Sequence, residues 1–136
     1  MKAYYKKSNG KVVELKQQVE LWLWSENIIE LIIPDGCKEV YCRNNQLKEL
    51  IIPDGCVRVS CQNNQLKELI LPDVCEYVRC FNNQLKELII PDNCGYVDCY
   101  NNQLKELILP DGCIWVRADM KSITELNKVE DLNLYL

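Results

Sequence analysis

Residues 44–62 read NNQLKELIIPDGCVRVSCQ, and the next two blocks of nineteen residues repeat this phrase with only a few changes. Residues 63–81 read NNQLKELILPDVCEYVRCF, and residues 82–100 read NNQLKELIIPDNCGYVDCY. A fixed period of about twenty residues is typical of solenoid proteins, in which each unit stacks only on its neighbours. The sequence therefore predicts one elongated repeat domain.

The same period holds on both sides of these blocks. Two columns of cysteine and one of proline keep the spacing: Cys37, Cys56, Cys75, Cys94 and Cys113; Cys42, Cys61, Cys80 and Cys99, continued by Ala118; and Pro34, Pro53, Pro72, Pro91 and Pro110. Each proline is followed by aspartate, which indicates a turn. The repeat therefore occupies most of the 136 residues.

From Cys56 to Leu66 the pattern is Cys-x-x-Val-x-Cys-x-x-Asn-x-Leu. It resembles the leucine-rich repeat signature L-x-x-L-x-L-x-x-N-x-L, with cysteine in two leucine positions. Four units match fully, and the resemblance extends in degraded form from Gln18 to Leu136. The units are most similar to the short repeats of bacterial effector and surface proteins. This resemblance implies a right-handed solenoid of about seven coils, with a parallel β-sheet on the concave side and short extended segments or turns on the other.

The resemblance also implies a single domain with three parts. Residues 1–17 are expected to form an N-terminal capping hairpin, 18–126 the repeats and 127–136 a terminal short repeat. The hairpin is predicted from Ala3–Lys7 and Lys11–Leu15 on either side of Ser-Asn-Gly. At the other end, residues 132–136 are predicted to form a strand, whose bare edge indicates either self-association or a place in a longer chain.

Within each coil, alternation predicts which side chains point inward. Val59 and Cys61 are expected to face the core, and Ser60 and Gln62 to face outward. Before each proline lies a short β-branched stretch that predicts a second extended segment, so that the coil is nearly all β. One apolar column of this stretch must then form an outer ridge: Ile32, Ile51, Ile70, Ile89 and Ile108.

The nine cysteines suggest zinc binding, disulfides, catalysis or core packing. A repeated spacing of four intervening residues presents the same residue at every level rather than a closed tetrahedral site. In-register parallel strands suit disulfide geometry poorly, and a catalytic cysteine would lack a histidine base because the chain has none. Buried, free thiols are therefore expected, with no metal or other cofactor and no enzymatic activity.

The asparagines at positions 45, 64, 83 and 102 occupy the signature position of the repeat. Their amides are expected to bond the backbone where each coil bends away from its strand.

The repeats differ mainly at the outward positions of the Val-x-Cys strands. All four arginines and eight of the eleven aromatic residues lie there. Tyr, Trp and Arg are the residues enriched at interface hot spots. The predicted partner-binding residues are Trp22, Trp24, Tyr41, Arg43, Arg58, Tyr77, Arg79, Phe81, Tyr96, Asp98, Tyr100, Trp115 and Arg117. The alternative for these side chains is mutual stacking that only stabilises neighbouring strands.

These observations favour a non-enzymatic module that binds a protein or peptide with some acidic groups. Carbohydrate or single-stranded nucleic-acid binding through the same aromatic residues, and a purely structural self-assembling protein, are the alternatives. A net charge of −4 disfavours nucleic acid, and no apolar run predicts a membrane span. The N-terminus has no cleavable signal pattern, so the expected location is the cytoplasm, or export without a cleaved signal peptide as for effectors.

Overall fold

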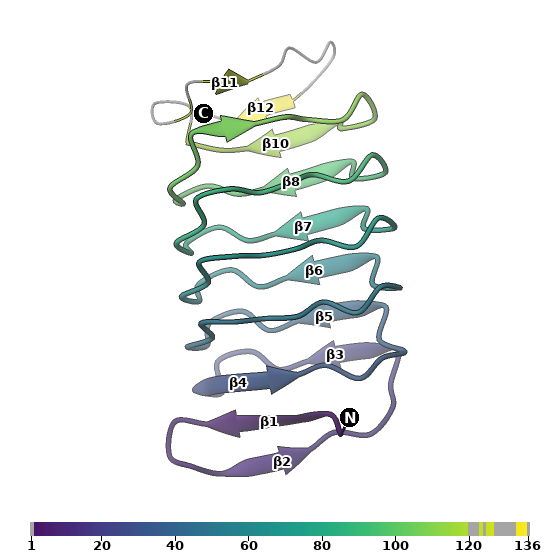
Figure 1. The fold of residues 1–136 in the computed structure, drawn as a ribbon, viewed down its shortest axis with the longest axis vertical. Coiled ribbons are helices and arrows are strands. Elements are labelled where there is room, and N and C mark those ends of the chain that lie inside the picture. Colours follow the sequence, from purple (N-terminus) through teal and green to yellow (C-terminus); the bar gives the residue numbers. More distant parts are fainter. Residues whose placement is uncertain (1, 120–122, 124, 127–132, 136) are drawn as a thin grey trace.

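The computed structural model describes residues 2–119, 123, 125–126 and 133–135, and these form a β-solenoid of about five turns. Figure 1 shows parallel strands stacked along one side of the solenoid and connecting segments along the other. Seven strands make the parallel sheet: β3 (Glu20–Trp22), β5 (Glu39–Tyr41), β6 (Arg58–Ser60), β7 (Tyr77–Arg79), β8 (Tyr96–Asp98), β10 (Trp115–Arg117) and β12 (Asn133–Tyr135). The described residues contain no helix, and thus none that is long and apolar enough to cross a membrane.

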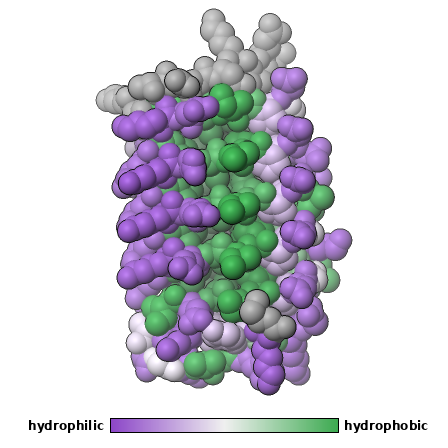
Figure 2. All heavy atoms as spheres, in the orientation of Figure 1, coloured by the Kyte–Doolittle hydropathy of each residue, from purple (hydrophilic) through white to green (hydrophobic). Residues whose placement is uncertain are grey.

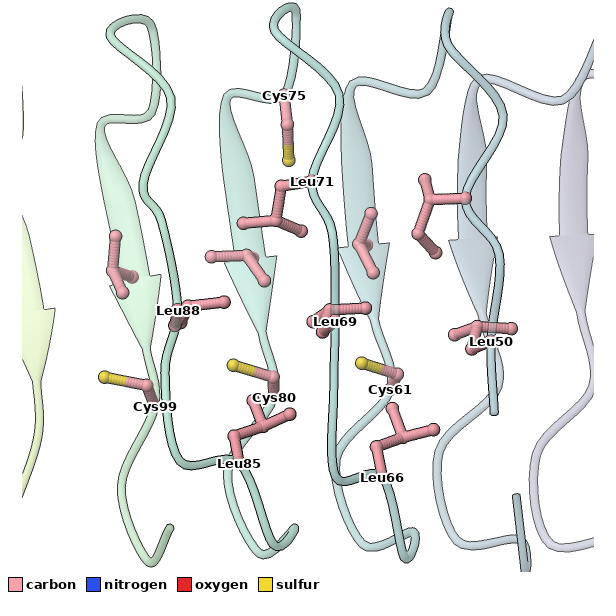
Figure 3. Close-up of a cluster of buried hydrophobic side chains, with 14 of the residues drawn as sticks. Leu50, Cys61, Leu66, Leu69, Leu71, Cys75, Cys80, Leu85, Leu88 and Cys99 are labelled. Carbon is pink, nitrogen blue, oxygen red and sulfur yellow. The ribbon is translucent and has the colours of Figure 1, made fainter. Parts of the chain in front are cut away.

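The sheet is in register, so that equivalent residues of successive repeats meet. Val40 pairs with Val59, Val59 with Val78, and Val78 with Val97. These valines are 0% exposed, and the cysteines two residues after them are also buried. Figure 3 shows Cys61, Cys80 and Cys99 on the sheet side, facing leucines from the opposite side of each coil. The predicted inward direction of the valine and cysteine columns is therefore confirmed.

Buried asparagines connect successive coils at the bend after each strand. The Nδ2 of Asn64 donates to the carbonyl oxygens of Cys61 at 3.0 Å in its own coil and of Cys42 at 3.1 Å in the preceding coil. Its Oδ1 accepts a hydrogen bond from the amide of Leu47 at 2.9 Å. Asn83 repeats this arrangement one coil further on. The predicted backbone-bonding role of the signature asparagine is confirmed.

The preceding asparagine of each pair has a different role, which the sequence analysis missed. Asn44, Asn63, Asn82 and Asn101 all adopt left-handed backbone conformations, with φ between 54° and 58°. Asparagine tolerates this region better than most residues. Their side-chain amides also bond one another from coil to coil, for example Asn63 Nδ2 to Asn44 Oδ1 at 2.6 Å.

The segments between the asparagine bend and the proline are residues 47–52, 66–71, 85–90 and 104–109, and we call them the front segments. Within them the side chains alternate as predicted: Leu50 and Ile52 are buried, whereas Ile51 is 78% exposed. Strand pairing on this side, however, involves only β4 (Ile28–Ile32), and β9 (Glu106–Leu107) with β11 (Glu125–Leu126), among the described residues. Each front segment is short and is followed by a proline, which cannot donate to a ladder.

The N-terminal residues form the predicted hairpin. Its strands are β1 (Tyr4–Lys7) and β2 (Val12–Glu14), which pair antiparallel. Strand β1 also pairs antiparallel with β4, and the Nζ of Lys7 lies 2.8 Å from a carboxylate oxygen of Glu26. At the other end, β12 pairs in parallel with β10, which confirms a strand at Asn133–Tyr135. The remainder of the predicted terminal repeat, 127–132 and 136, lies outside the described residues.

Candidate binding surface

The outward side of the parallel sheet, which we call the sheet face, carries the predicted binding residues. Because the strands are in register, these residues form columns along the solenoid. The three columns are Glu20, Glu39, Arg58, Tyr77, Tyr96 and Trp115; Trp22, Tyr41, Ser60, Arg79, Asp98 and Arg117; and Trp24, Arg43, Gln62, Phe81, Tyr100 and Asp119. The chain has three tryptophans, and all of them lie in these columns.

Near the C-terminal end of the sheet face, three aromatic rings form a continuous stack. The ring centroids of Tyr77 and Tyr96 are 4.3 Å apart, and those of Tyr96 and Trp115 are 4.2 Å apart, with interplanar angles of 12° and 1°. The guanidinium carbon of Arg58 lies 5.4 Å from the Tyr77 centroid at the start of the stack. All three rings are partly buried. Most ring faces in this stack are therefore covered by neighbouring side chains.

Near the N-terminal end lies a second group, Trp22, Trp24, Tyr41 and Arg43, which we call the tryptophan cluster. Trp22 stacks on Tyr41 with centroids 4.1 Å apart and meets Trp24 edge to face at 5.3 Å. The guanidinium carbon of Arg43 is 5.1 Å from the Trp24 centroid. Trp22 and Trp24 are nevertheless 51% and 40% exposed. These are the most exposed tryptophan side chains that the structure describes.

The arginines of the sheet face differ in their partners. Arg117 Nε lies 2.9 Å from Asp98 Oδ1, and its guanidinium carbon is 4.8 Å from the centroid of Phe81. Arg58 pairs with Glu39 at 3.3 Å. Arg79 differs from both, because its Nε is buried and has no hydrogen-bond partner among the described residues. The Arg79 Nε is therefore a buried donor left without an acceptor among the described residues.

Three predicted outward residues are buried. Asp98, Ser60 and Gln62 are only 1%, 5% and 2% exposed. They occupy outward positions, where Ser60 lies between Tyr41 and Arg79 of the adjacent strands and Asp98 lies between Arg79 and Arg117. The Ser60 hydroxyl donates to Gln62 Oε1 at 2.6 Å, and Asp98 holds Arg117. Asp98 therefore positions the Arg117 side chain and is not itself exposed to a partner.

Burial and neighbouring charges shift the pKa of two groups near the tryptophan cluster. Burial raises the pKa of Glu39, and the adjacent Glu20 carboxyl raises it further by hydrogen bonding and repulsion, while Arg58 lowers it. Burial also raises the pKa of Tyr41, with repulsion from Glu39 in the same direction. Glu20 and Glu39 are register partners on adjacent strands, next to the tryptophan cluster.

All nine cysteines are buried and free of disulfides. Burial raises the pKa of Cys42, Cys56 and Cys99 to about 12. A thiol with such a pKa is a poor nucleophile near neutral pH, because the thiolate is the reactive form. No group of three or more His, Cys, Asp or Glu side chains that could hold a metal occurs in the described part of the chain.

The opposite side of the solenoid presents a second feature. Ile51, Ile70, Ile89 and Ile108 are 78%, 73%, 84% and 54% exposed, and we call this column the isoleucine ridge. Figure 2 shows it as an apolar column with hydrophilic residues on both sides. A shallow groove of about 880 Å³ runs between the first two of these residues and is lined also by Lys48, Glu49 and Lys67. The predicted outer ridge is confirmed at these four positions.

Comparison of the sequence with models of known protein families gives no match, and no curated protein or solved structure matches it significantly.

Proposed function

We propose that the protein is a non-enzymatic interaction module that binds a partner protein or peptide through the sheet face, with the tryptophan cluster as its anchor. The observation that carries this proposal is the exposure of Trp22 and Trp24, 51% and 40%, beside Arg43. Exposed tryptophans next to arginine have the composition of interface hot spots. An aromatic surface is also costly to leave in water, so its presence favours a contact site.

The arrangement of the rings favours a protein over a sugar or a base. Carbohydrate and nucleic-acid sites present ring faces on which a ligand stacks. In the Tyr77–Tyr96–Trp115 stack the neighbouring rings cover each other's faces, which leaves the ring edges as the contact surface. Edges and hydroxyls suit the mixed apolar and polar surface of a protein. The stack itself also stabilises the sheet, so binding is proposed to centre on the tryptophan cluster.

The partner is proposed to carry acidic groups. Arg43 makes no ion pair among the described residues, and the buried Nε of Arg79 has no acceptor there. A carboxylate approaching the sheet face would supply charge-assisted hydrogen bonds to the Arg43 guanidinium. Each such bond contributes more when the partner excludes water from it.

The proposed architecture behind this surface is a right-handed solenoid of the leucine-rich-repeat type with about seven coils. The in-register parallel sheet and the asparagine bonds at each bend support it. In this proposal the β1–β2 hairpin caps the N-terminal end, because it pairs with β4 and covers that edge. Self-association through the C-terminal strand stays a prediction. Light scattering tests it by comparing the molar mass of the full chain with that of a variant lacking residues 133–135. The proposed location is a reducing compartment such as the cytoplasm, and the free thiols support this proposal.

The test is a comparison of partner capture between matched variants. The full chain and the Trp22→Ala/Trp24→Ala variant are immobilised and exposed to extract from the organism that makes the protein, and captured proteins are quantified by mass spectrometry. Val12→Ala is the control, since Val12 is 59% exposed on the hairpin, away from the sheet face. We expect a protein retained by wild type and the control but lost from the double variant. Equal capture by all three chains would refute the proposal.

A further inference from the structure

Strand β3 is the last strand at the N-terminal end of the parallel sheet. It pairs with β5 on one side, and no described strand pairs with it on the other. The N-terminal hairpin does not pair with this edge, because β1 and β2 form a separate sheet with β4. Figure 1 shows β3 at the end of the stacked strands. The parallel sheet therefore has an open edge along Glu20–Trp22.

The next coil shows which backbone groups this edge leaves without a strand. In β5 the amide of Glu39 donates to the carbonyl oxygen of Val19, in the preceding strand, at 3.1 Å. Glu20 is the register partner of Glu39 and occupies the equivalent position in β3, where no described strand precedes it. Because backbone direction alternates along a strand, the N–H and C=O groups of Glu20 and of Trp22 point away from β5, toward the open edge.

An extended peptide is the occupant that satisfies these groups in the way that successive coils satisfy one another. An open sheet edge accepts a strand from another chain; main-chain hydrogen bonds then supply affinity, and alternate side chains supply specificity. The edge is also continuous with the tryptophan cluster, because Trp22 belongs to both and the exposed Trp24 follows two residues later. A strand added to β3 extends the three columns of the sheet face by one level.

The first two columns of the sheet face indicate which side chains this strand carries. Glu20 and Glu39 are neighbours in the first column, and only Glu39 forms an ion pair among the described residues, with Arg58. A basic side chain beside Glu20 offsets this excess of negative charge. In the second column Trp22 stacks on Tyr41, so an aromatic side chain continues the column.

We propose that β3 binds an extended segment of the partner protein as an additional parallel strand, with a basic side chain beside Glu20, an aromatic one beside Trp22 and an acidic one within reach of Arg43. The parallel direction continues the hydrogen-bond geometry that joins each strand of this sheet to the next. This proposal rests on the sheet face as the binding surface and names the form in which the partner meets it.

The probe is a synthetic peptide, acetyl-Thr-Lys-Val-Tyr-Val-Asp-Thr-amide. Nuclear magnetic resonance of the isotope-labelled full chain follows its binding and the hydrogen exchange of the Glu20 and Trp22 amides. We expect saturable binding with a Kd below about 1 mM, and slower exchange of both amides. The charge-exchanged peptide, with Lys and Asp in each other's places, should bind at least about fivefold more weakly, because a parallel strand then places Asp beside Glu20.

Methylation of the peptide nitrogens separates strand addition from a contact made only by side chains. The amide of Leu23 in the β3 coil donates to the carbonyl oxygen of Tyr41 at 2.8 Å, and the second valine of the bound peptide is equivalent to Leu23. N-methylation of this valine removes its bond to the Trp22 carbonyl and should weaken binding at least about fivefold. N-methylation of the tyrosine is the matched control and should change the affinity little, because its N–H points away from β3.

Failure of the peptide to bind at about 1 mM, equal effects of the two methylations, or tighter binding of the charge-exchanged peptide would each overturn the proposal. Protection of the Glu20 and Trp22 amides that grows with protein concentration in the absence of peptide would show that a second copy occupies the edge, and would also overturn it. The proposed function fails separately. If the peptide does not bind but partner capture is still lost in Trp22→Ala/Trp24→Ala, strand addition alone is excluded.

Discussion

Replacing Asn64 by alanine tests how the buried amides hold one coil to the next. Asn64 Nδ2 donates to the carbonyl oxygens of Cys42 and Cys61, and its Oδ1 accepts from the amide of Leu47. The two carbonyls keep a second donor in the variant, Asn45 for Cys42 and Asn83 for Cys61, each at 3.1 Å. The Leu47 amide has no other acceptor among the described residues. It is therefore left buried without a partner.

The expected cost follows from these contacts. An unsatisfied buried N–H costs about 1–3 kcal/mol, and each of the two lost neutral hydrogen bonds about 0.5–1.5 kcal/mol. We expect Asn64→Ala to lower the free energy of unfolding by about 3 kcal/mol, a large share of the roughly 5–15 kcal/mol of a typical domain. Urea unfolding measures it as a shift of the midpoint at an unchanged slope.

The neighbouring Asn63 provides the matched control. Because its φ is 58°, Asn63 contributes to stability mainly by adopting the left-handed backbone conformation. Its side-chain amide also forms hydrogen bonds along the asparagine column, for example to Asn44. Asn63→Ala should cost about 1–2 kcal/mol, the penalty of the left-handed region for a residue with a Cβ. Asn63→Gly should cost less, because glycine adopts this conformation readily. A loss below about 1 kcal/mol in Asn64→Ala, or an equal loss in Asn63→Ala, would contradict the assigned role of the buried Asn64 amide.

Three further predictions concern the core, the ridge and the acidic pair. Native protein should react slowly with a thiol reagent even at pH 9, and all nine thiols should react after denaturation, because burial raises the pKa of thiols such as Cys42 to about 12; fast native labelling of most thiols would contradict this. Leu88→Ala should destabilise the monomer by about 2–5 kcal/mol in urea unfolding, whereas Ile89→Ala should change it by less than about 0.5 kcal/mol, since the two side chains are 6% and 84% exposed. Glu20→Gln should raise the free energy of unfolding at pH 7, because the pKa of Glu39 is raised in the folded state and ionisation of Glu39 therefore opposes folding. This gain should vanish as the pH falls below 4.5, the ordinary pKa of Glu39, where the carboxyl is protonated in both states. A gain that persists at low pH would exclude repulsion between the two carboxylates as the cause.

The features that could be predicted from the sequence are those that depend on period and alternation. A period of nineteen residues requires equivalent residues to stack, and alternation then places Val59 and Cys61 inward. The same reasoning found the asparagine bonds and the ridge at Ile51. These outcomes follow from local chain geometry, which each repeat carries in full.

The features that could not be predicted depend on the sizes of neighbouring side chains. Alternation alone places Ser60 and Asp98 outward, and only the structure shows that larger residues in adjacent coils cover them. Whether aromatic rings stack on each other or stay open also depends on rotamers, as at Tyr96 and Trp115. The left-handed conformation of Asn63 had a signal in the sequence, because asparagine pairs at a bend favour positive φ.

Tryptophan fluorescence shows whether the sheet face is the binding surface. All three tryptophans lie in its columns, and Trp22 and Trp24 are exposed. Acrylamide quenching is measured on the full chain alone and saturated with the captured partner, using partner in which tryptophan has been replaced by a non-fluorescent analogue. We predict that binding lowers the quenching constant several-fold, because the partner covers the tryptophan cluster. A quenching constant that is unchanged at saturation would exclude the sheet face as the binding surface, since the partner would then be bound elsewhere on the protein.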